Sequence, residues 1–170
     1  MSAETFTTAM FLITAVIAAG VLVNAVFPVV YNMAGTFSSA THESDERLRT
    51  DFKIVTYTAT PGAPPVGYAK VWLKNVGSSR ISIADFTNRS DVFCGKVGDF
   101  SRLTWASSGI GDNTWIEQKY DTNNNGYWDP GETVLVTAYT DIPTMTEGQV
   151  FFQFTLPSGV YRSIEFNAAS

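Results

Sequence analysis

The chain consists of a long apolar stretch followed by a region in which apolar and polar residues alternate. No charged side chain occurs from Thr5 to Thr41, and the residues from Phe6 to Val30 are mostly apolar. A helix crosses the hydrocarbon core of a bilayer with about 20 such residues, each of which adds about 1.5 Å. The pattern predicts an N-terminal helix over residues 1–47 that spans a membrane or packs in the hydrophobic core of a filament.

A cleaved signal peptide is the alternative interpretation of this stretch. It would need a basic start and a shorter apolar run, whereas the chain begins Met1-Ser2-Ala3-Glu4, with no Lys or Arg. We therefore expect the helix to be retained. Pro28 lies inside it, and because proline removes a backbone hydrogen bond, we expect a bend near residues 24–28.

The residues after Asp51 have the pattern of antiparallel strands. Short segments rich in Val, Ile, Thr and aromatic residues alternate with clusters of Gly, Pro, Asn, Asp and Ser. The predicted strands are Phe52–Ala59, Tyr68–Asn75, Arg80–Phe86, Asp91–Val97, Arg102–Ala106, Thr114–Tyr120, Thr133–Tyr139, Gln149–Leu156 and Ser158–Phe166. The predicted fold class is α+β, with a long N-terminal hydrophobic helix followed by an all-β immunoglobulin-like sandwich over residues 48–170.

Composition excludes several functions. The net charge of -5 and the pI of about 4.7 argue against binding to nucleic acid, which requires clustered basic residues. Cys94 is the only cysteine, so the chain cannot form an internal disulfide, and we expect this thiol to be buried. The only histidine, His42, is far from Cys94 in sequence, and no glycine-rich phosphate loop or Ser/His/Asp set occurs. The sequence therefore predicts a protein that is not an enzyme.

One segment, residues 121–132, has the spacing of a calcium-binding loop. Calcium takes six to eight oxygen ligands, and a twelve-residue loop supplies them from positions 1, 3, 5, 7, 9 and 12, with Gly at position 6 for the sharp turn. The candidate ligands are Asp121, Asn123, Asn125, the carbonyl of Tyr127, Asp129 and Glu132, and Gly126 stands at the sixth position. The loop predicts a weak, structural calcium site of the extracellular type. The alternative is an ordinary turn, although two to five residues would suffice for one.

A second short motif is Asn88-Arg89-Ser90, which is a sequon for N-glycosylation. Its use requires that this part of the chain is exported. We expect Asn88 to lie in an exposed loop.

Four segments resemble the archaellin and archaellum-accessory superfamily, and most closely its FlaG-like stator proteins. They are the apolar start Phe11–Gly20, the entry to the first strand at Leu48–Val55, the segment Val71–Ser78, and Asp91–Phe93. The resemblance extends over essentially the whole chain. Archaellins are made with a short charged leader that ends in Gly, and the start Met1-Ser2-Ala3-Glu4 departs from that pattern, which favours a FlaG-like protein over a filament subunit.

The resemblance implies a structural component of archaeal motility. A FlaG-like protein would be anchored in the cytoplasmic membrane by its helix, with its sandwich outside the cell beneath the surface layer. It would self-associate, bind a FlaF-like stator partner and surface-layer protein, and hold the archaellum motor against the envelope. The alternatives are an archaellin-like or pilin-like filament subunit and a membrane-tethered module that binds the surface layer.

Charge alone favours the opposite orientation in the membrane. Arg47 and Arg49 follow the apolar stretch, and nothing basic precedes it. The positive-inside rule would place residues after the span in the cytoplasm. The family resemblance, the calcium-type loop and the sequon favour an external sandwich.

Overall fold

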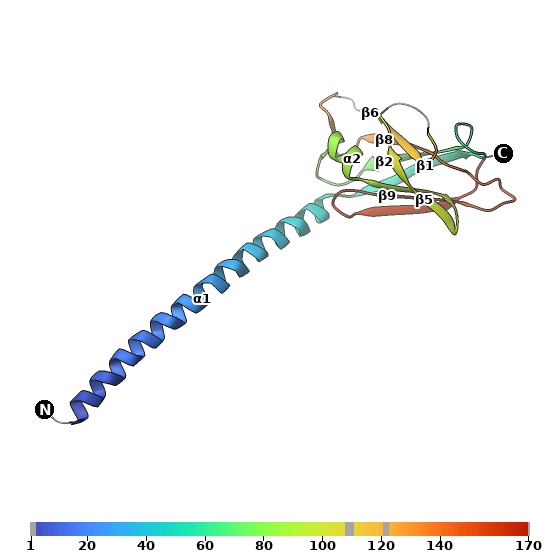
Figure 1. Cartoon of the computed structure of the whole chain (residues 1–170). Helices are drawn as coiled ribbons and strands as arrows, with labels where there is room; N and C mark the ends of the chain where they lie inside the picture. Colours follow the sequence, from blue (N-terminus) through green and yellow to red (C-terminus); the bar gives the residue numbers. More distant parts are fainter. Residues whose placement is uncertain (1–2, 108–110, 121–122, 170) are drawn as a thin grey trace. The chain divides into compact units, whose positions relative to one another are not determined.

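The computed structural model describes residues 3–107, 111–120 and 123–169, which fall into two compact units. The first unit covers residues 1–44, and the second covers residues 45–170. Helix α1 (Ala3–Arg49) forms the first unit and continues into the first residues of the second (Figure 1).

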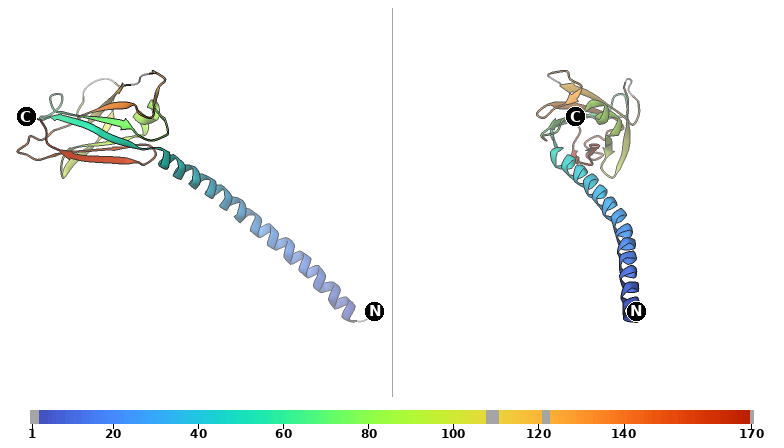
Figure 2. Two further views of the ribbon diagram at one scale, coloured as in Figure 1. Left: turned by 180° about the vertical axis from the view of Figure 1, so that it is seen from behind. Right: turned by 90° about the vertical axis from the view of Figure 1, so that its left-hand side faces the viewer.

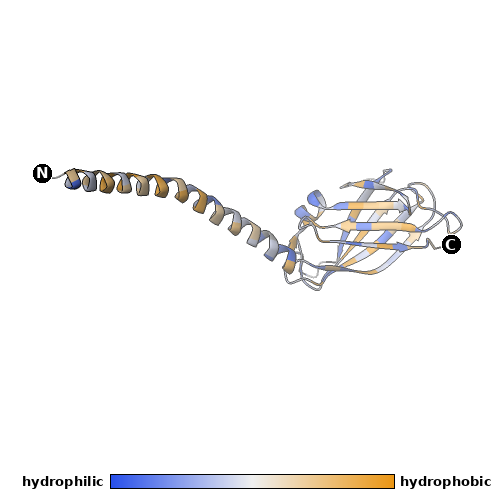
Figure 3. Cartoon of the chain, turned by 90° about the horizontal axis from the view of Figure 1, so that it is seen from below, coloured by the Kyte–Doolittle hydropathy of each residue, from blue (hydrophilic) through white to orange (hydrophobic). Residues whose placement is uncertain are grey.

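Helix α1 leaves its apolar side chains exposed along its whole length. Among the described residues it is the one helix long and apolar enough to cross a membrane, and none of its most apolar 18-residue window is buried. Figure 3 shows apolar residues on all sides of the helix, whose axis curves partway along, as the internal Pro28 predicts. The hydroxyls of Thr7, Thr8 and Thr14 donate to carbonyls four residues earlier, so these polar groups are satisfied without water.

The second unit is a β-sandwich of two four-stranded sheets. One sheet has the order β1 (Phe52–Thr60), β2 (Tyr68–Asn75), β8 (Thr133–Tyr139) and β6 (Thr114–Tyr120), and its strands are antiparallel. The other has the order β5 (Asp99–Trp105), β4 (Asp91–Lys96), β9 (Val150–Thr155) and β10 (Tyr161–Phe166), again antiparallel. The sheets join where β5 and β6 pair in parallel, at Thr104–Thr114 and Trp105–Trp115, and the two layers are visible in Figure 2.

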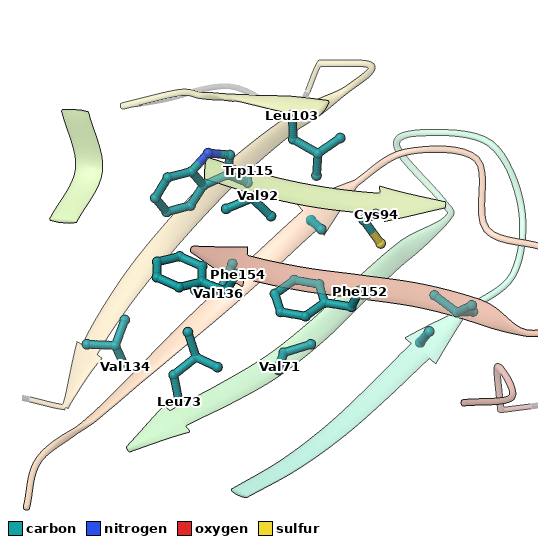
Figure 4. Packing of buried hydrophobic residues seen from close by; sticks show 14 of the residues in the cluster. Val71, Leu73, Val92, Cys94, Leu103, Trp115, Val134, Val136, Phe152 and Phe154 are labelled. Carbon is teal, nitrogen blue, oxygen red and sulfur yellow. The ribbon is translucent and has the colours of Figure 1, made fainter. Parts of the chain in front are cut away.

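The core lies between the inner faces of the two sheets. In β2 the side chains of Ala69, Val71 and Leu73 are buried, and the intervening Lys70, Trp72 and Lys74 are not, so the predicted alternation is confirmed. Figure 4 shows the inward side chains of β2 and β8 facing those of β4 and β9. Four aromatic rings, those of Phe52, Phe86, Trp128 and Phe154, contact one another in this core, with centroids 4.9–6.3 Å apart.

One predicted strand is wrong. The segment Arg80–Phe86 forms the two-residue strand β3 (Ile81–Ser82), which pairs with β7 (Tyr127–Trp128), and then the helix α2 (Ile83–Arg89). Alternation of Ile81 and Ile83 imitates a strand. From Ile83 onward, however, Phe86 and Thr87 follow at helical spacing and are both buried, while Thr87 Oγ1 donates to the Ile83 carbonyl over 3.0 Å.

Three of the remaining predicted strands, Tyr68–Asn75, Thr114–Tyr120 and Thr133–Tyr139, have the predicted bounds, and the other five are present with ends that differ by a few residues. The last one is shortened at its start, because Pro157 and Gly159 make a turn in which Gly159 N donates to the Leu156 carbonyl. The burial predicted for Cys94 is confirmed, since it is 0% exposed, and its burial raises the pKa of the thiol to about 12.

Candidate functional site

The end of α1 is attached to the sandwich by backbone hydrogen bonds within the second unit. The loop of residues 76–79, which follows β2, donates from four successive backbone N–H groups to the carbonyls of Arg49 and Asp51, over 2.8–3.1 Å. Carbonyls at a helix C-terminus have no partners inside the helix. The loop therefore caps the last turn of α1 and joins it to β1 and β2; we call these residues, 49–51 and 75–79, the junction.

Asn75 organises the junction from inside the protein. Its side chain is 0% exposed, and its Nδ2 donates to the carbonyls of Ser79 and Trp128, each over 3.0 Å. Its Oδ1 accepts from the backbone N–H of Gly77, also over 3.0 Å. A buried amide with three such bonds holds the backbone on both sides of it in place.

Gly77 is required at the junction by close packing. A Cβ atom at this position would lie 2.4 Å from the carbonyl oxygen of Arg49 and 2.6 Å from the backbone nitrogen of Asp51. Both neighbours are backbone atoms, so they cannot move aside without opening the junction. Sequence reasoning missed Asn75 and Gly77, although a polar residue at an inward position of the alternating strand β2 was the available signal.

An ion pair adds to the junction at its surface. Asp51 Oδ1 accepts from Arg162 Nη2 of β10 over 2.5 Å, and also from the backbone N–H of Phe52 over 2.8 Å. The two charged side chains are 45% and 42% exposed. Exposed pairs of this kind contribute little to stability, on the order of 0.5 kcal/mol. The backbone bonds and Asn75 therefore dominate the attachment.

The predicted calcium loop brings three of its candidate ligands together. Asn123 Nδ2 and Asn125 Nδ2 both donate to Asp129 Oδ2, over 3.0 Å and 2.6 Å. These two hydrogen bonds, with a smaller contribution from the charge of Arg80, hold the pKa of Asp129 below its usual range. Gly126 has a φ of 81°, as the sharp turn requires.

The other candidate ligands are placed differently. Glu132 Oε2 accepts from the backbone N–H of Asp129 over 2.9 Å. Tyr127 lies in β7, where its backbone N–H donates to Asn125 Oδ1 over 2.8 Å. Asp121 lies outside the described residues. Within the described part of the chain, no group of three His, Cys, Asp or Glu residues is arranged to hold a metal, so amide and carbonyl oxygens would have to supply much of such a site.

This loop is tied to the junction through β2. Asn75 N donates to the Glu132 carbonyl over 3.0 Å, and Gly131 N donates to the Asn75 carbonyl over 2.8 Å. Trp128, whose carbonyl accepts from the Asn75 side chain, is 1% exposed. The loop and the junction therefore share Asn75 as a hydrogen-bonding partner.

The sequon residue Asn88 is exposed, as predicted, but it lies in the last turn of α2 and not in a loop. Ser90, which follows that helix, is 8% exposed.

The chain belongs to the archaeal-type flagellin family, which matches residues 2–166. Members of this family are structural components of motility and not enzymes, as the sequence predicts. An uncharacterized protein of Archaeoglobus fulgidus is 27% identical to the chain over 161 residues, which are 94% of this chain and 95% of that protein.

Among solved structures the chain is similar to the archaellum periplasmic stator protein FlaG of Sulfolobus acidocaldarius. The TM-score is 0.53 at 24% identity, over 69% of this chain and 99% of FlaG. It is also similar to a chain in the complex of FlaF and FlaG from the same organism, with a TM-score of 0.52 at 23% identity, over 68% of this chain and 87% of that chain. These similarities confirm the FlaG-like β-sandwich fold.

Proposed function

We propose that this chain is a FlaG-like stator protein that anchors the archaellum motor to the cell envelope. The observation that carries the proposal is the match of its sandwich to nearly the whole of FlaG, a protein described as a periplasmic stator. Membership in the archaeal-type flagellin family supports a role in the archaellum machinery. The role is mechanical and requires no active site.

Helix α1 is the membrane anchor in this proposal. Its apolar side chains are exposed, and lipid or the helices of other subunits would cover them. The sandwich then lies outside the cytoplasmic membrane. The periplasmic placement of FlaG supports this orientation over the one that Arg47 and Arg49 would give by the positive-inside rule.

The junction is the part that would transmit force. A stator must resist torque between its anchor and its partner surface. Here the last turn of α1 continues directly into β1 and is held by four backbone hydrogen bonds from residues 76–79. The solved complex of FlaF and FlaG supports a FlaF-like partner for the sandwich, and self-association and surface-layer contact belong to the same proposal.

Deletion of the gene in its host tests the proposal. We expect cells that still assemble filaments but do not rotate them, and we expect motility to return with the wild-type gene. Absence of filaments would instead indicate a filament subunit, and unchanged motility would indicate a surface-layer-binding module. Either result would contradict the stator role.

We also propose that residues 121–132 bind a structural calcium ion. The spacing of the loop supports this, because it places oxygen-bearing side chains at the positions from which calcium loops supply their ligands. Asn123 and Asn125 contact Asp129 through their Nδ2 atoms, so both amides would have to turn their oxygens toward the ion. Sites of the extracellular type have a Kd of roughly 10⁻⁴ to 10⁻³ M. The ion would order the loop and, through Asn75, the junction.

Thermal unfolding of the full chain in detergent tests this site. For a Kd of about 1 mM, 10 mM calcium stabilises the folded state by about 1.4 kcal/mol, which raises the Tm by a few degrees. Asp129→Asn should abolish the increase, whereas Asp99→Asn, which removes an exposed carboxylate on β5, should retain it. An equal increase in both variants, or none in the wild type, would contradict the calcium site.

A further inference from the structure

The proposed mechanical role does not explain the exposed Asn88 and the buried Ser90 of the sequon. Asn88-Arg89-Ser90 is the only Asn-X-Ser/Thr sequence in the chain. The Asn88 side chain is exposed on α2 and, within the described residues, makes no hydrogen bond. Its amide nitrogen is therefore free to carry a substituent that extends into solvent.

Ser90 has a hydroxyl that the fold does not use. The residue is 8% exposed, and its Oγ has no hydrogen-bond partner in the described part of the protein. A buried hydroxyl without a partner costs free energy, so alanine would suit the folded state better. Attachment of a saccharide to Asn88 supplies a reason for serine, because the sequon requires Ser or Thr two residues after the modified Asn.

A pocket of about 240 Å³ adjoins both residues. It is bounded by the end of α2, by β5 and by Trp115 of β6. Pockets for drug-sized ligands are larger, about 300–1,000 Å³. This pocket is therefore suited to one small ring and not to a chain of several.

The lining of the pocket fits a sugar ring. Half-buried Trp105 supplies an aromatic surface for the C–H face of a pyranose. Its indole N–H donates to Glu117 Oε2 over 2.5 Å, which fixes the orientation of the ring. Exposed Arg102 and Thr104 supply polar groups for sugar hydroxyls, and Arg102 is itself held by Asp91.

We propose that Asn88 carries an N-linked saccharide whose first sugar occupies this pocket against Trp105. The donor is a saccharide carried on a lipid phosphate, and an oligosaccharyltransferase catalyses the transfer. The Asn88 Nδ2 atom forms a bond to C1 of the sugar while the bond from C1 to the phosphate oxygen breaks. The phosphate leaves on the lipid with the bonding electron pair, and the amide loses one proton.

The burial of Ser90 also determines whether glycosylation comes before or after folding. In the folded protein Asn88 faces solvent while the Ser90 hydroxyl is covered, so a transferase cannot engage both. Attachment therefore precedes the packing of α2 against the core. The inference rests on the external placement of the sandwich proposed above, because lipid-linked saccharide transfer to surface proteins takes place on the outer side of the membrane.

Intact mass spectrometry tests the attachment. The full chain, purified from an archaeal host that N-glycosylates its surface proteins, should exceed its sequence mass by that of a saccharide. Asn88→Gln and Ser90→Ala should return the mass to that of the sequence, and Ser90→Thr should keep the increase. As a folding control, Ser90→Ala made in a bacterial host should have a Tm no lower than wild type, because it removes only an unpartnered hydroxyl.

Protease treatment of intact cells separates this inference from the proposed function. If the protease cleaves the sandwich on intact cells but the wild-type chain has its unmodified sequence mass, the glycosylation is overturned and the stator role still stands. A sandwich that resists the protease, yet is cleaved after lysis, overturns both.

A comparison of Tm values tests the seating of the sugar. The glycosylated wild type should have a Tm above that of the unmodified protein from the bacterial host, by an amount on the order of 3 °C. Trp105→Leu should lose this difference while keeping the mass increase, and Trp72→Leu, a half-buried tryptophan on β2 away from the pocket, should keep both. An undiminished difference in Trp105→Leu overturns the seating.

Discussion

At the scale of single residues, Asn75 connects the junction with the predicted calcium loop. Its side chain joins the junction loop at Gly77 and Ser79 to the carbonyl of Trp128, which lies within the predicted calcium loop. The side chain is fully buried, and its bond to the Trp128 carbonyl forms away from water. One polar side chain therefore couples two loops that are far apart in sequence.

Asn75→Ala should destabilise the sandwich by about 3 kcal/mol, because it removes three hydrogen bonds, of which the one to the Trp128 carbonyl is buried. Urea unfolding of the full chain measures this change. Lys74→Ala, an exposed position on the same strand, should change the free energy of unfolding by less than about 0.5 kcal/mol. Similar losses in the two variants would show that Asn75 has no special role.

Asp129 should make the loop sensitive to acid. Its folded pKa is held below the usual value by hydrogen bonds from Asn123 and Asn125, with help from Arg80. A depressed carboxyl pKa stabilises the folded loop above the unfolded pKa, and that contribution is lost as the pH falls through the folded value. NMR titration should give a midpoint below the usual value for Asp129. Asn125→Ala should raise the midpoint, and an unchanged midpoint would contradict the proposed cause.

Cys94 should be chemically inert in the folded protein. Burial raises its pKa to about 12, so almost no thiolate exists at neutral pH. A thiol reagent should label it only after denaturation. Rapid labelling under native conditions would show that the interior of the sandwich opens.

At the scale of elements, the sequence predicts the strands whose apolar residues alternate, and it misses the helix whose formation depends on contacts with distant strands. The strand Tyr68–Asn75 is predicted with its bounds and inward face because alternation and burial agree there. The segment Ile83–Arg89 is missed because Ile81 and Ile83 alternate as in a strand, and the burial of Phe86, which decides the matter, depends on Trp115 and Phe154 from distant strands. The convergence of Asn123, Asn125 and Asp129 follows from loop spacing alone.

Gly77→Ala should open the junction while leaving the core intact. The added Cβ would lie 2.4 Å from the Arg49 carbonyl oxygen, so the loop of residues 76–79 must move away from the end of α1. Hydrogen exchange should then show faster exchange of the Ser78 and Ser79 amides and little change in β9. Ser78→Ala, an exposed change in the same loop, should leave exchange unaltered. Protected amides in Gly77→Ala would contradict the role of the junction.

At the scale of the whole molecule, the chain combines an apolar helix with a β-sandwich, and the loop of residues 76–79 caps the last turn of the helix. Within the described residues, no group of three His, Cys, Asp or Glu residues is placed to hold a metal. The chain belongs to a family of structural motility components, and its sandwich has the fold of a stator protein. An anchored protein that bears load between the membrane and an external partner accounts for all three features.

The most direct test of the stator role is the position of the protein on the cell. An antibody against the sandwich, applied to intact and gently stripped cells and detected with gold by electron microscopy, locates it relative to the filaments. We predict label confined to the envelope at filament bases. Label along the length of shed filaments, or spread evenly over the envelope, would contradict a motor-anchoring function.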